Sequence, residues 1–464
     1  MWCARAVLLP IYSKPFYPPL HSSFKRLPNH SSAHCLHSAR SPNVVEILEE
    51  RGLLEALTSD SLRSLNPSPL KVYCGFDPTA ESLHLGNLLG IIVLSWFQRC
   101  GHSAVALIGG ATATIGDPSG KTLERPELDE ETLERNTIGI TSIVTRILSR
   151  RGISFQVMNN YDWWKEVKLL DFLKQVGRYA RVGTMSAKES VKKRLESDQG
   201  MSYTEFTYQL LQGYDFLHLC EKEGVNVQIG GSDQWGNITA GTELIRKILQ
   251  PESETAYGLT FPLLLKSDGT KFGKSEDGAI WLSSSLLYPY KFYQYFFSVP
   301  DADVIRFLKM LTFLEMETIR DIEREMQGPG YVQNSAQKKL AEEVTRFVHG
   351  EEGLEEAVKA TEALRPGKET KLNWVAIEGI AKDVPCCSLA YGEVVEASVI
   401  DISVVSGLVE SKSAARRLVK QGGLYLNNTR VESESKRVES NDIVDGKVLF
   451  LSAGKKNKVI VRVK

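Results

Sequence analysis

The sequence predicts a three-part α/β protein: a domain built on a parallel sheet, then an all-helical domain, then a small α+β module. Short apolar runs alternate with helical spacing in the first part, helical spacing alone follows, and β-rich runs surround one helix near the C-terminus. Alternating strands and helices are typical of a parallel sheet with right-handed crossovers. We expect the three domains to span residues 44–285, 286–390 and 396–464.

The composition is that of an ordinary globular chain. Its 464 residues leave room for about two to four domains, and 42% are hydrophobic and 24% charged. The formal net charge of −1 excludes a general affinity for nucleic acid, so any RNA contact has to come from a local basic patch. No apolar run reaches the ~18 residues that span a bilayer, so we expect no membrane partner.

The cysteine pattern argues against disulfides and against a metal centre. The seven cysteines form no Cys-x-x-Cys pair, and Cys386 and Cys387 are adjacent. Such spacing is a poor framework for disulfide bonds or for zinc. We therefore expect reduced thiols and no protein-bound metal.

The first 45 residues differ in kind from the rest. No Asp or Glu precedes Glu46, while five Lys and Arg residues are scattered among serines, prolines and four of the eight histidines. A basic, serine-rich leader without acidic residues is typical of an organellar transit peptide. We assign residues 1–43 to such a peptide, which predicts delivery to the mitochondrial matrix, the chloroplast stroma or both.

The first domain begins with residues 44–63, where apolar side chains recur at helical spacing. Residues 71–76 predict a strand, Pro78 and Thr79 a turn, and residues 83–99 a helix. Further short apolar runs, each followed by glycine or polar residues, predict strands at 103–108, 155–158 and 225–229. In parallel sheets ligands bind beyond the carboxyl ends of the strands, and the polar motifs below lie largely at those ends.

The two remaining domains have different patterns. Residues 286–364 keep helical spacing, and Gly328-Pro329-Gly330 separates two helical stretches. In the last domain Ser411 is a capping residue for a basic helix that ends at Gly422. Short β-rich runs follow at 424–426, 447–451 and 459–463. From Glu396 onward thirteen Lys and Arg stand against eight Asp and Glu, which is a local basic excess.

Two short segments carry the strongest chemical signal. Lys271-Phe272-Gly273-Lys274-Ser275 places two lysines three apart on a loop with a glycine. Lysine is a compact charge and glycine lets the backbone approach a ligand, so this loop suits a polyphosphate. His84-Leu85-Gly86-Asn87 opens a predicted helix, whose first N–H groups attract phosphate. Either segment alone is usually a solvated surface feature, but the two together favour a nucleotide site.

A third glycine-rich segment, residues 116–122, resembles a P-loop but has only three residues between its glycines, where a P-loop needs four. We reject a P-loop on that count. Lys121 and Arg125 still add positive charge to this loop.

Polar residues also gather after the strand at 225–229 and on one helix. Residues 228–237 run from the strand into a Gly-rich turn, where the carboxylate of Asp233 suits the hydroxyls of a ribose. On the helix predicted over residues 203–217, Tyr208, Gln212 and Asp215 recur at i, i+4 and i+7 and so share one face. Such a stripe commonly faces solvent, but its apolar neighbours favour a pocket.

These groups match the two ends of an aromatic amino acid. A phenolic hydroxyl needs an acceptor and a donor, which Asp215 and Tyr73 supply. An ammonium group needs carboxylate and carbonyl acceptors, for which Asp117, Tyr208 and Gln212 are candidates. No serine or cysteine pairs visibly with a histidine as nucleophile and base, which fits a reaction in which the substrate's own carboxylate attacks.

With these residues in place, the chain from residue 44 onward resembles the bacterial-type and organellar tyrosyl-tRNA synthetases, a family of class I. The resemblance lies in four segments, which are 73–79, 116–120, 230–237 and 271–275. It implies a Rossmann-like catalytic domain, a helical anticodon-binding domain and a C-terminal RNA-binding module. It also implies a homodimer with L-tyrosine, ATP together with Mg²⁺, and tRNA-Tyr as substrates.

The resemblance assigns a role to each matching position. Tyr73 and Asp215 would bind the phenol, and Asp117, Tyr208 and Gln212 the ammonium group. Asp77, Gly231 and Asp233 would contact adenosine, Gln234 the reacting carboxylate, and Thr79 and His84 the γ-phosphate. Lys121, Arg125, Lys271 and Lys274 would clamp the departing pyrophosphate, with Asn87 and Ser275 also at the ATP site. Lys412, Arg416, Arg417 and Lys420 would contact tRNA. The segment His84-Leu85-Gly86-Asn87 corresponds to the first ATP-binding signature of the family, which usually ends in His. This chain has Asn87 there, and its amide can still donate to the nucleotide.

Two alternatives remain at this point. A tryptophanyl-tRNA synthetase shares the fold and both ATP-binding segments, but the indole N–H needs only an acceptor, so Tyr73 would have no donor role. A protein that binds RNA and merely retains a synthetase body is the alternative of another class. The intact lysines argue against an inactive enzyme.

Overall fold

The computed structural model describes residues 43–64, 69–121, 123–151, 155–250, 255–275, 278–363, 374, 377, 384–454 and 457–464. The expected transit peptide, residues 1–43, lies outside this range except for Asn43, whose side chain caps the first helix by accepting from Val45 N. Among the helices that the structure describes, none combines the length and apolar character needed to cross a bilayer.

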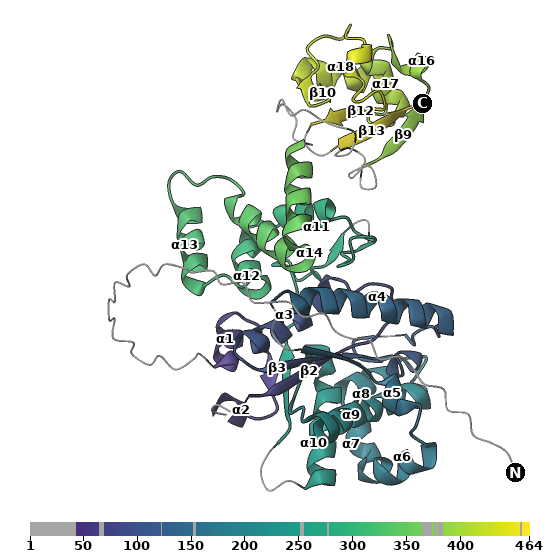
Figure 1. Cartoon of the computed structure of the whole chain (residues 1–464), viewed down its shortest axis with the longest axis vertical. Helices are drawn as coiled ribbons and strands as arrows, with labels where there is room; N and C mark the ends of the chain where they lie inside the picture. The colour runs from purple at the N-terminus through teal and green to yellow at the C-terminus, as the bar shows by residue number, and fades with distance from the viewer. Residues whose placement is uncertain are drawn as a thin grey trace, which may run out of the picture. The chain divides into compact units, whose positions relative to one another are not determined.

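A six-stranded sheet forms the first domain, in the order β1-β6-β5-β2-β3-β4 (Figure 1). Its strands are β1 (Ala56–Leu57), β2 (Lys71–Phe76), β3 (Ser103–Ile108), β4 (Phe155–Asn159), β5 (Val227–Gly231) and β6 (Tyr257–Phe261). All neighbours are parallel except β1, which runs antiparallel to β6. The chain passes from β2 to β3 and β4 on one side, then returns to β5 and β6 on the other. The strand order therefore reverses between β2 and β5, where ligands bind in such sheets.

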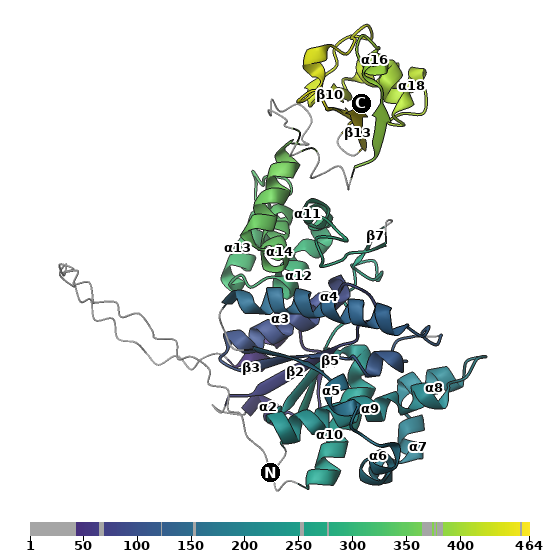
Figure 2. The same cartoon turned by 45° about the vertical axis from the view of Figure 1, so that its right-hand side comes forward.

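Helices cover both faces of this sheet (Figure 2). The helices α3 (Leu85–Arg99) and α4 (Glu130–Leu148) lie on one face, and α9 (Tyr203–Glu223) and α10 (Trp235–Leu249) on the other. Alternate residues of β2 serve the two layers, because Val72, Cys74 and Phe76 belong to one core and Tyr73 to the other. The short helices between β4 and α9 are α5 (Tyr161–Trp164), α6 (Leu169–Gln175), α7 (Val182–Ser186) and α8 (Glu189–Leu195).

The expected helix over residues 44–63 is wrong. Only α1 (Val44–Glu50) and the single turn α2 (Ser61–Ser64) are helical, with β1 between them. Gly52 has φ 70°, a left-handed conformation that ends α1 and that glycine adopts without strain. Beyond it the backbone pairs with β6 instead, and the apolar side chains that suggested one long helix pack into the same core from three elements.

The second domain is helical as expected, with α11 (Pro289–Phe297), α12 (Asp301–Leu311), α13 (Met316–Gln327) and α14 (Ser335–Ala363). Its apolar core is continuous with that of the first domain. The helix α14 is broken at Gly350, which has φ 82°. Arg150 of the first domain donates through Nη1 to the carbonyls of Arg346 and Phe347, at 2.9 and 2.7 Å. A side chain from one domain therefore caps a helix end of the other.

The C-terminal module has a five-stranded sheet in the order β11-β10-β12-β13-β9. Its strands are β9 (Cys386–Leu389), β10 (Leu424–Leu426), β11 (Thr429–Arg430), β12 (Val448–Ala453) and β13 (Asn457–Val463), and its helices are α16 (Tyr391–Val394), α17 (Val399–Val405) and α18 (Lys412–Gln421). As predicted, Ser411 caps α18 by accepting from Ala414 N, and Gly422 ends it in the left-handed region.

The expected boundary between the second domain and this module is wrong by several residues. The expected limits were residue 390 for the helical domain and residue 396 for the module. Cys386–Leu389, placed in the helical domain, instead pairs in parallel with Ile460–Val463 of β13. A four-residue strand is too short to be recognised by alternation, and only its pairing with the end of the chain defines it.

Candidate active site

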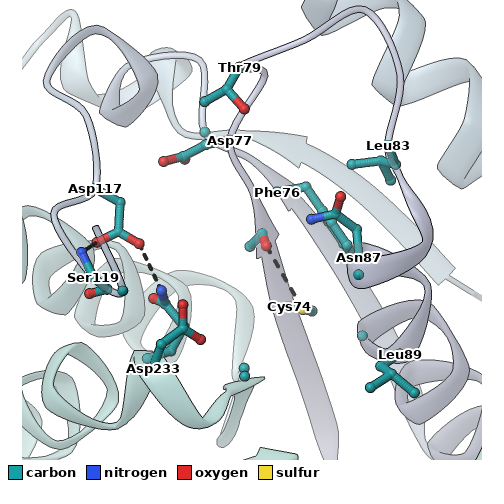
Figure 3. Close-up of a pocket in the computed structure, with 18 of the residues that line it drawn as sticks. Cys74, Phe76, Asp77, Thr79, Leu83, Asn87, Leu89, Asp117, Ser119 and Asp233 are labelled. Atoms are coloured by element: carbon teal, nitrogen blue, oxygen red, sulfur yellow. Dashed lines mark hydrogen bonds between the residues drawn. The ribbon is translucent and has the colours of Figure 1, made fainter. Parts of the chain in front are cut away.

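A cavity of ≈ 500 Å³ lies at the carboxyl ends of the parallel strands, where the strand order reverses. Figure 3 shows Asp77 and Thr79 at the end of β2, opposite Asp117 and Asp233. The side chains or backbones that line it include Tyr73, Asp77, Thr79, His84, Asn87, Asp117, Lys121, Arg125, Tyr208, Gln212, Asp215, Gly231, Asp233, Gln234 and Lys271. These are the predicted site residues of the first domain except Lys274 and Ser275, whose side chains lie outside the described part of the chain.

The two signature segments meet at this cavity through the backbone of Ile280. Its N–H donates to Gly273 O at 3.1 Å, and its carbonyl accepts from Leu85 N at 2.8 Å. Gly273 has φ 117°, and a Cβ there would lie 3.3 Å from Leu85 Cβ. The positive φ therefore favours glycine, a Cβ would be a tight fit, and the lysine loop lies against the start of α3.

His84 and Asn87 form a reciprocal cap at the start of α3. His84 Nδ1 accepts from Gly86 N at 3.1 Å, and Asn87 Oδ1 accepts from His84 N at 3.1 Å. A neutral imidazole that accepts at Nδ1 carries its hydrogen on Nε2, and Asn87 keeps its amide NH₂ for other partners. The expected donor role toward phosphate is thus compatible with both side chains.

At the inner end of the cavity, Asp215 is held by three neutral donors. Oδ1 accepts from the indoles of Trp163 and Trp164 at 2.9 and 2.7 Å, and Oδ2 accepts from Asn160 Nδ2 at 2.9 Å. Burial raises the pKa of Asp215 to about 7, and these hydrogen bonds oppose that rise. Sequence reasoning missed all three donors, although they directly follow the strand predicted at 155–158.

The hydroxyl of Tyr73 belongs to the same end of the cavity. Tyr73 is 1% exposed, and its hydroxyl has no hydrogen-bond partner within the described residues. Burial, followed by the charge of Asp215, raises its pKa well above the usual range, so the hydroxyl keeps its proton. A buried hydroxyl is stabilised by a partner, so a ligand that both donates to Asp215 and accepts from Tyr73 fits here.

The middle of the cavity is organised around Asp117. Its carboxylate accepts from Ser119 N at 2.9 Å and from Gln234 Nε2 at 2.7 Å (Figure 3). It also accepts from Asn237 Nδ2 at 3.4 Å. Asn237 Nδ2 also donates to Gln212 Oε1 at 3.0 Å. Polar groups that were predicted separately, from a loop, a helix and a turn, therefore form one connected set.

Asp77 connects this set to the end of β2. It accepts from Tyr208 Oη at 2.6 Å and from Thr112 Oγ1 at 2.9 Å, and burial raises its pKa to about 6. Burial also raises the pKa of Asp233. The cavity is thus lined by four carboxyl groups, those of Asp77, Asp117, Asp215 and Asp233, and by the cations Lys121, Arg125 and Lys271, so it offers partners to both positive and negative ligand groups.

The basic helix α18 carries the four residues predicted to contact tRNA, and their side chains are exposed. Lys412 lies 2.7 Å from Asp401, and Arg416 and Lys420 lie 3.6 and 3.5 Å from Glu434. Exposed ion pairs contribute little stability, so these side chains can exchange partners at small cost.

Comparison with known proteins agrees with the geometry. A family model described as "tRNA synthetases class I (W and Y)" matches residues 65–364, and one described as "Tyrosine--tRNA ligase SYY-like C-terminal domain" matches residues 376–461. The second match begins before β9, in line with the corrected boundary.

Individual relatives are similar over most of the chain. A protein of Arabidopsis thaliana named "Tyrosine--tRNA ligase, chloroplastic/mitochondrial" is 72% identical over 429 residues, covering 91% of this chain and 84% of its own length. The "Tyrosine--tRNA ligase" of Protochlamydia amoebophila is 52% identical over 422 residues, covering 90% and 99%. The crystal structure of a C-terminally truncated Aspergillus nidulans mitochondrial tyrosyl-tRNA synthetase superimposes with a TM-score of 0.60 at 33% identity, covering 68% of this chain and 92% of that chain.

Proposed function

We propose roles for the residues of this cavity from one premise: the chain belongs to the class I tyrosyl-tRNA synthetase family and is a tyrosine–tRNA ligase. It uses ATP to activate tyrosine and transfers the amino acid to tRNA-Tyr. The observation that carries the assignment is that Asp215 and Tyr73 line the same cavity as His84 and Lys271.

In the first step, a carboxylate oxygen of tyrosine attacks the α-phosphorus of ATP in line, and the bond to the bridging oxygen of pyrophosphate breaks. Tyr73 and Asp215 hold the phenol, and Asp117, Tyr208 and Gln212 hold the ammonium group. Gln234 orients the carboxylate, and Asp77, Gly231 and Asp233 hold adenosine. This arrangement accelerates the reaction by positioning the two reactants.

Negative charge moves onto pyrophosphate as that bond breaks. Thr79 and His84 contact the γ-phosphate, Asn87 and Ser275 belong to the same ATP site, and Lys121, Arg125, Lys271 and Lys274 neutralise the leaving group. Groups that bind more tightly in the transition state than in the ground state raise the rate of the chemical step. A ribose hydroxyl at the 3′ end of tRNA-Tyr then attacks the acyl carbon, and AMP leaves.

ATP enters as its magnesium complex. Within the described residues no three acidic, His or Cys side chains are grouped so as to hold a metal ion. Mg²⁺ typically keeps several waters and binds through substrate phosphates with one or two carboxylates, so the donor set of the cavity fits an ion delivered by the nucleotide. The ion would neutralise phosphate charge, and the protein residues would orient the nucleotide around it.

The choice between tyrosine and tryptophan is tested by pyrophosphate exchange with each amino acid. We expect exchange with tyrosine and none above background with tryptophan, because an indole N–H cannot accept from Tyr73. Exchange that is faster with tryptophan than with tyrosine would overturn the phenol assignment.

Tyrosine binding should weaken as the pH falls. The phenol donates to the Asp215 carboxylate, and burial raises the pKa of Asp215 to about 7, so the acceptor is lost as the pH falls through that value. We expect the KM for tyrosine in pyrophosphate exchange to rise about tenfold between pH 8 and pH 6. Phenylalanine contacts the same titrating groups but has no hydroxyl to bond Asp215, so its KM should not rise in the same way. An equal rise in the KM for phenylalanine would contradict the assignment.

We propose a homodimer in which α6 contributes to the interface. Leu169 and Leu170 of this helix are 71% and 77% exposed, while Phe172 is buried. Neighbouring exposed leucines mark surfaces that associate with other proteins. Sedimentation velocity measures the mass directly, and a species at the monomer mass at micromolar concentration would exclude this proposal.

Delivery to the mitochondrion, the chloroplast or both is proposed from the acid-free leader and from the name of the Arabidopsis relative. A fusion of residues 1–43 to a fluorescent protein tests this delivery by imaging in plant cells. Diffuse cytosolic fluorescence would contradict it.

Removal of the C-terminal module should separate the two steps of the reaction. We expect deletion of residues 376–464 to reduce tRNA charging strongly, because phosphate contacts from Lys412, Arg416, Arg417 and Lys420 are lost, and to spare pyrophosphate exchange. Charging of the full chain should also fall steeply with added salt. Equal loss of exchange and charging would assign the module a structural role instead.

A further inference from the structure

The loop Lys271–Ser275 is anchored by side chains of the helical domain. Phe272 is 6% exposed and packs against Phe307 of α12, with ring centroids 4.2 Å apart, and against Tyr295 of α11 at 4.9 Å. These rings lie beyond the predicted boundary of the catalytic domain. A loop of the active site therefore inserts its aromatic side chain into the core of another domain.

The backbone of the same loop is held at Gly273. Its N–H donates to Tyr295 Oη at 2.9 Å, and its carbonyl accepts from Ile280 N at 3.1 Å. One bond thus comes from the helical domain. The other comes from Ile280, whose carbonyl also accepts from Leu85 N at the start of α3. Gly273 is fixed from both sides, and Lys271 two residues earlier lines the cavity.

A hairpin over residues 264–272, in which Phe272 N donates to Leu264 O and Lys266 N donates to Thr270 O, leads into the loop and is held in the same way. Asp303 of α12 is 1% exposed and accepts from Ser267 N at 2.9 Å and from Ser267 Oγ at 3.2 Å. Arg306 pairs with Asp303 at 2.9 Å and donates to Leu265 O. Helix α12 thereby holds the first arm of this hairpin, and α11 holds Gly273, which follows the hairpin.

We propose that Tyr295 is a positioning residue for adenylate formation, through which the helical domain sets the place of Lys271 at the pyrophosphate end of the cavity. The proposal rests on the clamp role proposed for Lys271. The hydroxyl is the informative group, because a phenylalanine ring at this position would pack against Phe272 in the same way. What the hydroxyl adds is one acceptor for the Gly273 N–H.

The variant Tyr295→Phe tests this directly. Loss of one hydrogen bond to the loop should lower the single-turnover rate of tyrosyl-adenylate formation about 5-fold, with the KM for tyrosine and the Tm unchanged. Tyr293→Phe is the matched control, because Tyr293 lies on the same helix, is 2% exposed and stacks on Phe297 instead of the loop. Equal rates for the two variants, or a rate loss that follows the Tm, would overturn the proposal.

Lys271→Ala separates the proposal from the clamp role on which it rests. If Lys271→Ala leaves the rate unchanged, the clamp role fails. If Lys271→Ala is slow and Tyr295→Phe is not, the clamp role stands and the positioning role fails. In the double variant Tyr295→Phe should add little to Lys271→Ala, because both act through the same ammonium group; additive losses would contradict this coupling.

Asp303→Asn is an independent test at the other anchor. It keeps the size of the side chain and removes the charge that pairs with Arg306, so the hairpin loosens without a cavity. We expect a lower rate of adenylate formation with an unchanged KM for tyrosine. An increased KM for tyrosine would show a general disturbance of the active site and contradict the proposal.

Discussion

Asp215→Asn should lower the preference for tyrosine over phenylalanine about 10- to 100-fold. The carboxylate is the acceptor for the substrate phenol, and an asparagine at this position presents an NH₂ group toward one of its neighbours in place of an acceptor. Hydrogen bonds to charged groups are worth about 1.5–3 kcal/mol, so kcat/KM for tyrosine should fall about 10- to 100-fold. Phenylalanine loses no hydrogen bond and should react at nearly its former rate.

The measurement is pyrophosphate exchange with tyrosine and with phenylalanine on the same preparations. Sites built to bond a hydroxyl reject the analogue that lacks it; enzymes of this family are the standard example, at about 10⁵-fold, and that magnitude is taken over from them. Asp233→Asn is the matched control, because Asp233 lines the same cavity at the proposed ribose end. It should raise the KM for ATP and leave the preference between amino acids intact. An unchanged preference in Asp215→Asn would refute the phenol assignment.

Lys274→Ala should slow adenylate formation strongly while the affinity for tyrosine barely changes. The backbone of Lys274 pairs with Ala279, which lines the cavity, in the two-stranded ribbon of β7 (Lys274–Ser275) and β8 (Gly278–Ala279). An ammonium group that meets pyrophosphate mainly in the transition state affects the rate and not the binding of the amino acid. Loss of one such group typically costs about 10²- to 10³-fold in rate.

Single-turnover formation of tyrosyl-adenylate gives the rate, and equilibrium dialysis gives the affinity for tyrosine. Lys266→Ala serves as the control. Lys266 belongs to the hairpin of residues 264–272 that precedes the loop, and it is absent from the lining of the cavity. It should be indistinguishable from the unmodified chain. A parallel loss of tyrosine affinity in Lys274→Ala would assign the lysine to substrate binding.

The sequence predicted four of the six strands of the first sheet and the lining of the cavity, for a physical reason, but not β1 or β6. A buried parallel strand needs a short apolar run, and residues 71–76 and 103–108 have the observed bounds of β2 and β3. Because parallel strands end at one edge of the sheet, polar motifs that follow them meet there. Asp77 and Asp233 therefore line one cavity although they come from distant segments.

What escaped prediction depends on contacts between distant segments. Trp163 and Trp164 lie on the short helix α5, and an aromatic pair there gives no sign that both indoles donate to Asp215. The four residues of β9 become a strand only by pairing with β13. Likewise, nothing in the sequence of α11 indicates that Tyr295 accepts from Gly273.

The break in α14 has a consequence for how the chain assembles. The carbonyls of Arg346 and Phe347 are capped by Arg150, which the ribosome makes almost two hundred residues earlier. The first half of α14 therefore ends against a side chain of the N-terminal domain, and the two domains share one apolar core. Synthesis from the N-terminus supplies the parts in that order, and the two domains should melt in a single cooperative transition.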